Sequence, residues 1–501
     1  MKNFDFYFKE TGEVGYIQSI SSSIFYVSGL PNARINELVL AENGMVGIVR
    51  AVLEDLVEVM VFEGQTLIHN MKVVRTNEYF QVGTSEAFLG RIIDPFGSVQ
   101  DSQLPIPASK LTYKYMESEA LPISARVRID RKLETGVIAV DTMVPVGMGQ
   151  RELVLGDAKV GKTTFCLQTI VSQARRGTIC IYVCCGKKKS DLKFVESYLL
   201  RLKVLDRVVI IAATSSDPAP MVYMAPFSAM SIAEYFRDKD KDVLVVIDDM
   251  TTHAKFYREI SLLARRPPGR QSYPGDIFHL HAKIAERAGN FKTKSQKAVS
   301  ITLLPIAETQ EGDLTGYIQT NLMAMTDGHI FFDVVEAKKG KLPAVNFGLS
   351  VTRVGNQTRS QIEREISDYI GVKLSEVRQA EELGKFGVEL TETTMKVIDE
   401  GKKIDAVFQQ DASLIIPGDL QILFAGLLIA RFWEEASFAK INFEQKMLAI
   451  AYETGLLNKI RLKLAKITKL RELYDLINSQ KASLTQIIAK VKKQDEDTNR
   501  G

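Results

Sequence analysis

Hydrophobic and polar positions change their period along the chain, and the first stretch has the pattern of short strands. Apolar, β-rich runs lie between turn residues at 15–20, 24–27, 37–40, 45–53 and 56–61. Five or six strands at this spacing are typical of a small barrel, so we predict a β-barrel collar domain over residues 1–78. This stretch is largely apolar and acidic, which favours a structural role over an oligonucleotide-binding barrel.

After the predicted barrel, strands alternate with helices, and then helices follow alone. The strand candidates are 179–183, 208–212, 243–247 and 300–304, and they predict a mostly parallel sheet covered on both faces over residues 79–359. Helical periodicity predicts a bundle over residues 360–501, with helices at 362–370, 374–383, 391–399, 417–433, 442–453 and 460–476. The dense apolar run from 414 to 429 predicts bundle core rather than a membrane segment. We expect the charged end, 490–501, to be frayed.

One stretch of the α/β region has the spacing of a phosphate-binding loop. Residues 156–164 read GDAKVGKTT and fit G-x-x-x-x-G-K-T between the apolar run 152–155 and a helix whose predicted apolar face is Cys166, Leu167, Ile170, Val171 and Ala174. In such a loop the backbone N–H groups cradle phosphates, the lysine adds charge and the threonine hydroxyl ligates Mg²⁺. A turn that matches by chance is the alternative. We predict nucleotide binding by Gly156, Asp157, Ala158, Lys159, Val160, Gly161, Lys162, Thr163 and Thr164.

An acidic pair follows the strand at 243–247. A carboxylate at the C-terminal end of a parallel strand lies in the crevice where ligands bind. We therefore predict that Asp248 is the partner of Thr163 around Mg²⁺, through water. Asp248 and Asp249 taken alone would indicate a solvated turn, but downstream of a phosphate loop in the same sheet they indicate its second acidic motif.

Composition narrows the functional classes. The chain has 501 residues, 46% of them hydrophobic, and its 64 basic and 61 acidic residues give a net charge of +3, which argues against nucleic acid as the main partner. The four cysteines, 166, 180, 184 and 185, lack metal-ligand spacing and predict reduced, buried packing residues. A vicinal redox switch at 184 and 185 is the alternative. With no signal peptide or long apolar run, we expect a cytosolic chain unless a partner holds it at a membrane.

Several long runs resemble the alpha-type subunit of the F-type rotary ATP synthase head. They are GQRELVLGDAKVGKTT (149–164), SSDPAPMVYMAPFSAMSIAEYFRD (215–238), RRPPGRQSYPGDIFHLHAKIAERA (265–288), AETQEGD (307–313) and PAVNFGLSVTRVG (343–355). The resemblance covers nearly the whole chain and is closer to the alpha type than to its catalytic beta-type sibling. It implies a RecA-like P-loop nucleotide-binding domain that binds ATP or ADP with Mg²⁺. It also implies a bundle around a gamma-type central shaft, an alternating 3:3 hexamer with beta-type subunits, and peripheral attachment to the cytoplasmic side of the cell membrane through partner subunits.

The resemblance also implies a non-catalytic site. Beta-type subunits place a Glu just after the strand that follows the loop helix, and alpha-type subunits normally have a Gln there. This chain has Lys187. A lysine is no base at neutral pH unless strongly desolvated, and Lys188 and Lys189 beside it predict a solvated cluster. An exposed loop of three lysines is the simpler interpretation and is equally compatible with a non-catalytic site.

A second family run predicts a residue that acts on a neighbouring subunit. The family's S-V-S-R run stands here as Ser350, Val351, Thr352 and Arg353. The resemblance implies that Arg353 and Ser350 act at the beta-type subunit's nucleotide, with Arg353 as an arginine finger. A planar, permanently charged guanidinium suits the task because it bridges phosphoryl oxygens. A plain interface salt bridge is the alternative for Arg353.

Departures from the family predict a divergent relative. Pro343 and Gln410 align with residues near the adenine, whereas Leu342 and Ala412 replace an Arg and a Gln. We also expect the chain to lack the family's further N-terminal stretch before the barrel. Proton-coupled ATP synthesis or hydrolysis is the leading interpretation, and an F-type-like motor that drives another mechanical task, such as gliding motility in wall-less bacteria, is the alternative. A hexameric ATP-dependent transcription terminator is a third class, which the barrel composition and the bundle disfavour.

Overall fold

The structure of the protein is a computed structural model that describes residues 2–62, 67–385 and 391–498. The chain forms two compact units. The first consists of Met1–Arg128, Gly149–Leu155 and Ala174–Asp327, and the second of Ile129–Met148, Gly156–Gln173 and Gly328–Gly501. The predicted domain boundaries at residues 78 and 359 stay predictions.

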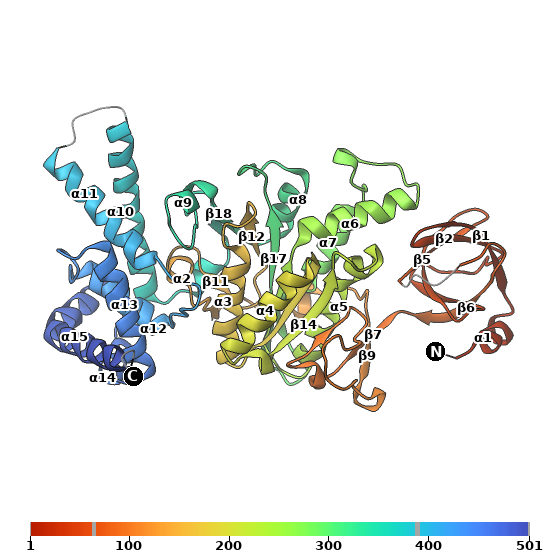
Figure 1. Ribbon diagram of the computed structural model, residues 1–501, viewed down its shortest axis with the longest axis horizontal. Coiled ribbons are helices and arrows are strands. Elements are labelled where there is room, and N and C mark those ends of the chain that lie inside the picture. The colour runs from red at the N-terminus through yellow and green to blue at the C-terminus, as the bar shows by residue number, and fades with distance from the viewer. Residues whose placement is uncertain (1, 63–66, 386–390, 499–501) are drawn as a thin grey trace. The chain divides into compact units, whose positions relative to one another are not determined.

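The first unit contains the predicted barrel, which closes in the order β1-β2-β5-β4-β3-β6 with every pair antiparallel (Figure 1). Its strands are β1 (Val14–Ser21), β2 (Ile24–Ser28), β3 (Glu37–Ala41), β4 (Val46–Val52), β5 (Val57–Val61) and β6 (Lys72–Tyr79). Valines such as Val27, Val39 and Val59 fill its interior, and closure leaves no unpaired strand edge. The barrel prediction is confirmed. A helix that the sequence analysis did not predict, α1 (Phe4–Thr11), precedes it, capped by the side chain of Asn3.

The first unit also contains a sheet in the order β12-β17-β15-β13-β14-β8. The strands are β8 (Ile92–Ile93), β12 (Glu152–Gly156), β13 (Ile179–Lys187), β14 (Val208–Thr214), β15 (Val243–Asp248) and β17 (Ala298–Glu308), with β16 (Gly289–Lys292) antiparallel to β17 and a separate pair β7 (Gln81–Thr84) and β9 (Thr112–Tyr115). The pairs β13·β14, β13·β15 and β15·β17 are parallel. All four strands predicted from their apolar runs are present. Continuous apolar runs are expected here, because parallel strands are buried on both faces of the sheet.

Helices cover this sheet. They are α4 (Lys189–Arg201), α5 (Ala219–Arg237), α6 (Met250–Leu263), α7 (Ile277–Glu286) and α8 (Tyr317–Met325). Helix α5 packs on β13, β14 and β15, and α6 packs on β13 and β17 (Figure 1). Asp249 caps α6, because its side chain accepts a hydrogen bond from the Thr252 N–H at 2.6 Å.

The second unit holds short strands, the helix after the phosphate loop and the C-terminal helices. These elements are β10 (Lys132–Leu133), β11 (Val146–Gly147), β18 (Gly328–Phe332), β19 (Val351–Thr352), α2 (Ile138–Met143), α3 (Lys162–Arg175), α9 (Val334–Lys338), α10 (Gln361–Lys385), α11 (Glu392–Phe408), α12 (Gly418–Ile429), α13 (Phe438–Glu453), α14 (Asn458–Leu464) and α15 (Leu470–Thr498). The predicted apolar face of α3 is buried, but so are Phe165, Gln168, Thr169 and Ser172, so this helix is buried nearly all round.

The helical bundle is confirmed, with corrected boundaries. The predicted break at 371–373 is wrong, because 361–385 form one continuous helix. The single helix predicted over 460–476 is two helices, α14 and α15. The end predicted to be frayed is helical as far as Thr498. Tertiary packing explains why these helix boundaries differ from the predicted ones, since most helical stability in proteins comes from burying an apolar face rather than from local propensity.

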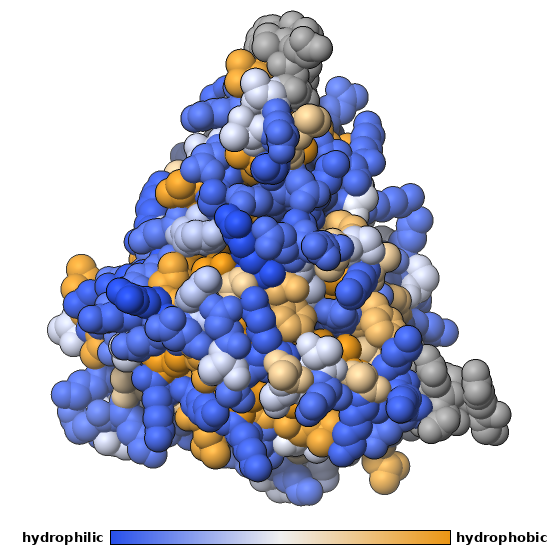
Figure 2. All heavy atoms as spheres, turned by 90° about the vertical axis from the view of Figure 1, so that its left-hand side faces the viewer, coloured by the Kyte–Doolittle hydropathy of each residue, from blue (hydrophilic) through white to orange (hydrophobic). Residues whose placement is uncertain are grey.

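The apolar run of the bundle lies inside it. Leu420, Leu423, Phe424 and Leu427 of α12 are buried in one core cluster with residues of α10, α11, α13 and α15. The side of the molecule formed by these helices shows mostly hydrophilic residues, with smaller hydrophobic areas between them (Figure 2). Among the described residues, no helix is both long and apolar enough to span a membrane. All four cysteines are buried and free, as predicted.

Candidate functional site

The phosphate loop follows β12 and has the backbone shape that its glycines allow. Gly156 has φ +151°, and a Cβ there would lie 2.3 Å from the carbonyl oxygen of Phe332. Gly161 has φ +102° with open space around it, so conformation alone requires glycine at that position. Lys159 also has positive φ, at +65°. The sequence motif therefore corresponds to a sharply turned loop.

Lys162 directs its charge back into this loop. Its ammonium donates hydrogen bonds to the carbonyl oxygens of Gly156 at 2.7 Å and Asp157 at 2.5 Å, and the residue is only 6% exposed. Lys162 is also the first residue of α3, whose N-terminal N–H groups and dipole favour an anion. The loop, the helix start and the ammonium thus fit a phosphate chain.

The remaining loop residues surround this point. Ala158 and Lys159 are exposed, Asp157, Thr163 and Thr164 are half-buried, and Val160 is buried. Thr163 and Thr164 belong to the first turn of α3. The predicted nucleotide-binding segment is therefore contiguous and reachable from solvent, and its contact with nucleotide stays a prediction.

The acidic pair lies in the first unit, at the C-terminal end of β15. Asp248 pairs in parallel register with Cys184 of β13, and both Asp248 and Asp249 are 1% exposed. The hydroxyl of Tyr182 donates to Asp248 Oδ2 at 2.9 Å. Tyr182 was missed by the sequence analysis, since only the pairing of β13 with β15 brings it to the carboxylate. The pair is buried, so the alternative of a solvated turn is wrong.

Lys187 contacts both carboxylates. Its Nζ lies 2.7 Å from Asp248 Oδ1 and 3.2 Å from Asp249 Oδ2, and its side chain is 21% exposed. Burial by itself lowers the pKa of Lys187, but the two carboxylates outweigh burial and leave the pKa above its ordinary value. The predicted solvated cluster is therefore wrong for Lys187, although Lys188 and Lys189 are exposed as expected.

Of the two predicted magnesium ligands, Thr163 suits the ion better than Asp248 does. Thr163 offers a half-buried hydroxyl at the start of α3, which suits Mg²⁺ bound to phosphates. Asp248 is already engaged on both oxygens, by the ammonium of Lys187 and the hydroxyl of Tyr182. Within residues 2–62, 67–385 and 391–498, no group of three or more His, Cys, Asp or Glu is arranged to hold a metal. A carboxylate with a protein cation in contact does not match the metal-facing role predicted for it.

The buried thiols beside this pair have little thiolate character. Burial, with the charge of Asp248 adding to it, raises the pKa of Cys184 to about 12. Burial also raises the pKa of Cys185 well above its ordinary value. Reactive cysteines have lowered pKa values and partial exposure, so these surroundings favour packing residues over the alternative of a redox switch.

Arg353 follows the short strand β19, which pairs with β18. Its side chain is exposed, and it forms no ion pair with any residue that the structure describes. The hydroxyl of Ser350 accepts from the Phe331 N–H at 3.0 Å and donates to the Asn346 carbonyl at 2.7 Å. Ser350 is therefore hydrogen-bonded within the chain and helps to fix this segment, and Arg353 is exposed three residues further on.

The residues predicted to lie near the base are brought together by the chain. Gln410 N–H donates to the Leu342 carbonyl at 2.8 Å, next to Pro343. The side-chain amide of Gln410 donates to the carbonyls of Gly136 at 2.7 Å and Leu414 at 2.6 Å, and accepts from the Ile138 N–H at 3.1 Å. Pro343 lines a cavity of about 420 Å³. The amide of Gln410 serves backbone groups, and its predicted contact with adenine stays a prediction.

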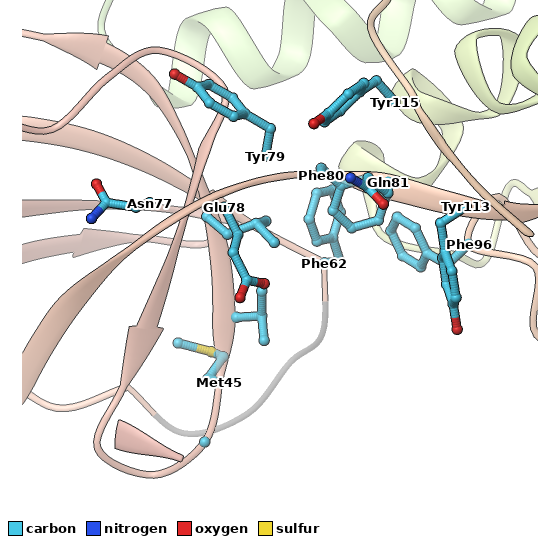
Figure 3. A pocket seen from close by; sticks show the side chains of 13 residues that line it. Met45, Phe62, Asn77, Glu78, Tyr79, Phe80, Gln81, Phe96, Tyr113 and Tyr115 are labelled. Atoms are coloured by element: carbon cyan, nitrogen blue, oxygen red, sulfur yellow. The ribbon is translucent and has the colours of Figure 1, made fainter. Parts of the chain in front are cut away.

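A larger cavity lies elsewhere, beside the barrel. It measures about 770 Å³, and the rings of Phe62, Phe80 and Phe96 gather at its wall with centroids 4.7 to 5.9 Å apart (Figure 3). Glu78 lines it, and no described lysine or arginine does. An aromatic, acidic wall does not complement phosphate charge, so this cavity is not the nucleotide site.

Comparisons with known proteins agree with the loop and the fold. The model of the ATP synthase alpha/beta family, nucleotide-binding domain, matches residues 136–352. Proteins named ATP synthase subunit alpha from Staphylococcus aureus strains JH9, JH1 and Mu3 are each 37% identical to this chain over 453 residues. The alignments cover 90% of this chain and 90% of each relative.

Proposed function

The chain belongs to the ATP synthase alpha/beta family and is of the alpha type, and on that premise we propose that it is a non-catalytic, regulatory nucleotide-binding subunit of a hexameric rotary ATPase. It binds ATP or ADP at residues 156–164, where the hydroxyl of Thr163 is the ligand for any Mg²⁺ that arrives with the phosphates. The observation that carries the non-catalytic assignment is the contact of Lys187 with Asp248 and Asp249.

Hydrolysis needs a polar group that positions and activates water in line with the γ-phosphate. The ammonium of Lys187 has donors only and keeps its proton, because two carboxylates favour the charged form. It cannot accept a proton from water at neutral pH. A site with this side chain at the end of β13 binds nucleotide and leaves it intact.

The proposed contribution to catalysis is made at a neighbour. Arg353 is exposed at the edge of β19, as a side chain that reaches across an interface must be. We assign it the role of an arginine finger for a beta-type subunit, with Ser350 as the residue that positions its segment. In this proposal the chain alternates with beta-type subunits in a 3:3 hexamer around a gamma-type shaft. Partner subunits hold that assembly at the cytoplasmic side of the cell membrane.

The test uses the purified full chain. We expect ATP to bind and the rate of phosphate release to equal the enzyme-free rate. Lys162→Gln should weaken ATP binding by about tenfold or more, since charge-assisted hydrogen bonds contribute roughly 1.5–3 kcal/mol. Lys193→Gln, which removes an exposed charge from α4, is the matched control and should leave Kd unchanged. Steady turnover by the isolated chain that Lys162→Gln abolishes would overturn the proposal.

A further inference from the structure

We propose that the ammonium of Lys187 stands in for a divalent cation beside Asp248 and Asp249, so that this chain binds nucleotide with little dependence on Mg²⁺. The inference rests on the proposed nucleotide-binding function and adds a property to it. It arises from the mismatch between the predicted metal-facing carboxylate and the contacts that this carboxylate makes.

The backbone aims Lys187 at the acidic pair. The pairing of β13 with β14 shifts register between Cys185 and Lys187, and such an irregularity at a strand end redirects the next side chain. Gly186 makes the turn with φ +71°, where a Cβ would lie 2.6 Å from Phe256 Cε2 and Thr252 Cγ2. Only glycine lets β13 pass this close to α6, and the turn directs Lys187 toward the strand end of β15.

The contacts of Asp248 leave little room for a metal to act. Its Oδ1 lies 2.7 Å from the ammonium and its Oδ2 accepts the Tyr182 hydroxyl at 2.9 Å. Asp249 also has contacts of its own, because it caps α6 and forms the second ion pair of Lys187. Mg²⁺ keeps most of its waters and demands near-octahedral oxygen geometry, so it would have to displace a tethered cation from a buried site.

The ammonium of Lys187 neutralises negative charge at the carboxyl ends of these strands. Two buried carboxylates at the carboxyl ends of parallel strands, where ligands bind in α/β sheets, would repel a triphosphate unless a cation neutralises them. A divalent ion ordinarily performs this neutralisation, as part of the nucleotide complex. In this chain a covalently attached ammonium does so before any ligand arrives.

The experiment measures Kd for ATP by isothermal titration calorimetry on the full chain, once in excess MgCl₂ and once in excess EDTA. For the natural chain we expect the two values to agree within about threefold, whereas Lys187→Gln should bind about tenfold or more weakly in EDTA than in MgCl₂. Lys188→Gln is the matched control, because Lys188 is the exposed neighbour, and it should behave as the natural chain does.

A second readout follows the metal itself. Electron paramagnetic resonance of Mn²⁺ with the ADP-bound chain should show tighter Mn²⁺ binding in Lys187→Gln than in the natural chain. Lys187→Arg keeps the charge and should match the natural chain in both measurements, which covers the case in which Lys187→Gln does not fold.

The outcomes separate the two proposals. A natural chain that loses tenfold or more of its affinity in EDTA, or one whose Mn²⁺ affinity equals that of Lys187→Gln, overturns this inference and leaves nucleotide binding standing. A chain that binds ATP in neither buffer overturns the proposed function itself.

Discussion

Two cationic side chains of this protein have opposite surroundings. Lys187, at the end of β13, is mostly buried and contacts two carboxylates of its own chain. Arg353, just after β19, is exposed and forms no ion pair with the described residues. The charge of Lys187 is paired within the chain, whereas the charge of Arg353 has no ion-pair partner among the described residues.

The comparison shows that the role of a charged residue depends on what it is already bonded to. A lysine held by two buried carboxylates keeps its proton and does not serve as a base at neutral pH. An arginine without an internal partner loses no contact when it meets a phosphoryl group on a neighbour. The proposed function requires this arrangement, because in that proposal the subunit binds a nucleotide passively and acts on the nucleotide of another subunit.

The largest expected effect concerns the outward charge. Arg353→Lys should lower the ATPase rate of the assembled complex with its beta-type partner on the order of 10³-fold, because lysine cannot bridge phosphoryl oxygens as a guanidinium does. The measurement is steady-state phosphate release by the purified complex, with size-exclusion chromatography to show that assembly is intact. Arg471→Lys, at another exposed arginine of the second unit, is the control.

If the complex with Arg353→Lys kept the natural ATPase rate, Arg353 would have no role in catalysis and would not differ from Lys187 in this respect. Arg353 would then be an interface or solvent-exposed charge, which is the alternative that the sequence left open.

A smaller effect is expected on stability when the inward charge is removed. Lys187→Gln leaves two buried carboxylates without their cation, and breaking a buried pair in this way costs about 3 kcal/mol of the free energy of unfolding. Urea unfolding followed by circular dichroism measures it, and Lys188→Gln should stay within about 0.5 kcal/mol of the natural chain. Adding Asp249→Asn to Lys187→Gln should recover part of the loss, because it removes one of the two unpaired buried carboxylates. The cap of α6 is kept in this variant, since Asn also caps helices. Equal losses in Lys187→Gln and Lys188→Gln would show that the ion pairs contribute nothing.

The effect that is smallest per pH unit is the dependence of the free energy of unfolding on acid. His253, one turn along α6 from Asp249, lies with its Nδ1 3.2 Å from Nε2 of His281, and both rings are buried. Burial lowers the pKa of His253 from 6.5 to about 4 and lowers the pKa of His281 well below its ordinary value. The unfolded chain therefore binds more protons between these values, and the free energy of unfolding falls as pH drops from 6.5 toward 4.

This slope can be measured directly. Each buried histidine contributes at most about 1.4 kcal/mol per pH unit, so His281→Gln should flatten the dependence of the free energy of unfolding on pH in that window. His279→Gln, at an exposed histidine of α7, the helix that also carries His281, should leave the slope unchanged. An unchanged slope in His281→Gln would mean that burial does not keep the ring of His281, on α7, unprotonated in the folded chain.

Much of the architecture followed from local pattern. Five of the six barrel strands, the four central strands and the bundle were predicted, because a strand buried on one or both faces and an amphipathic helix have distinct periods. The continuous helix α10 across Gly371 and the helix α1 were not predicted. Their formation depends on which surface each segment packs against, and that surface is built by residues distant in the sequence.

The candidate site divides in the same way. The sequence by itself determined the phosphate loop, because Gly156, Gly161 and Lys162 meet requirements that lie within nine consecutive residues. Only the tertiary structure decided that Lys187 contacts Asp248 and that Tyr182 supports it, since β13 and β15 are neighbours in the sheet but about sixty residues apart in the chain. Backbone conformation is a local property that a short motif can encode, whereas the partner of a charge is set by which distant strands pair.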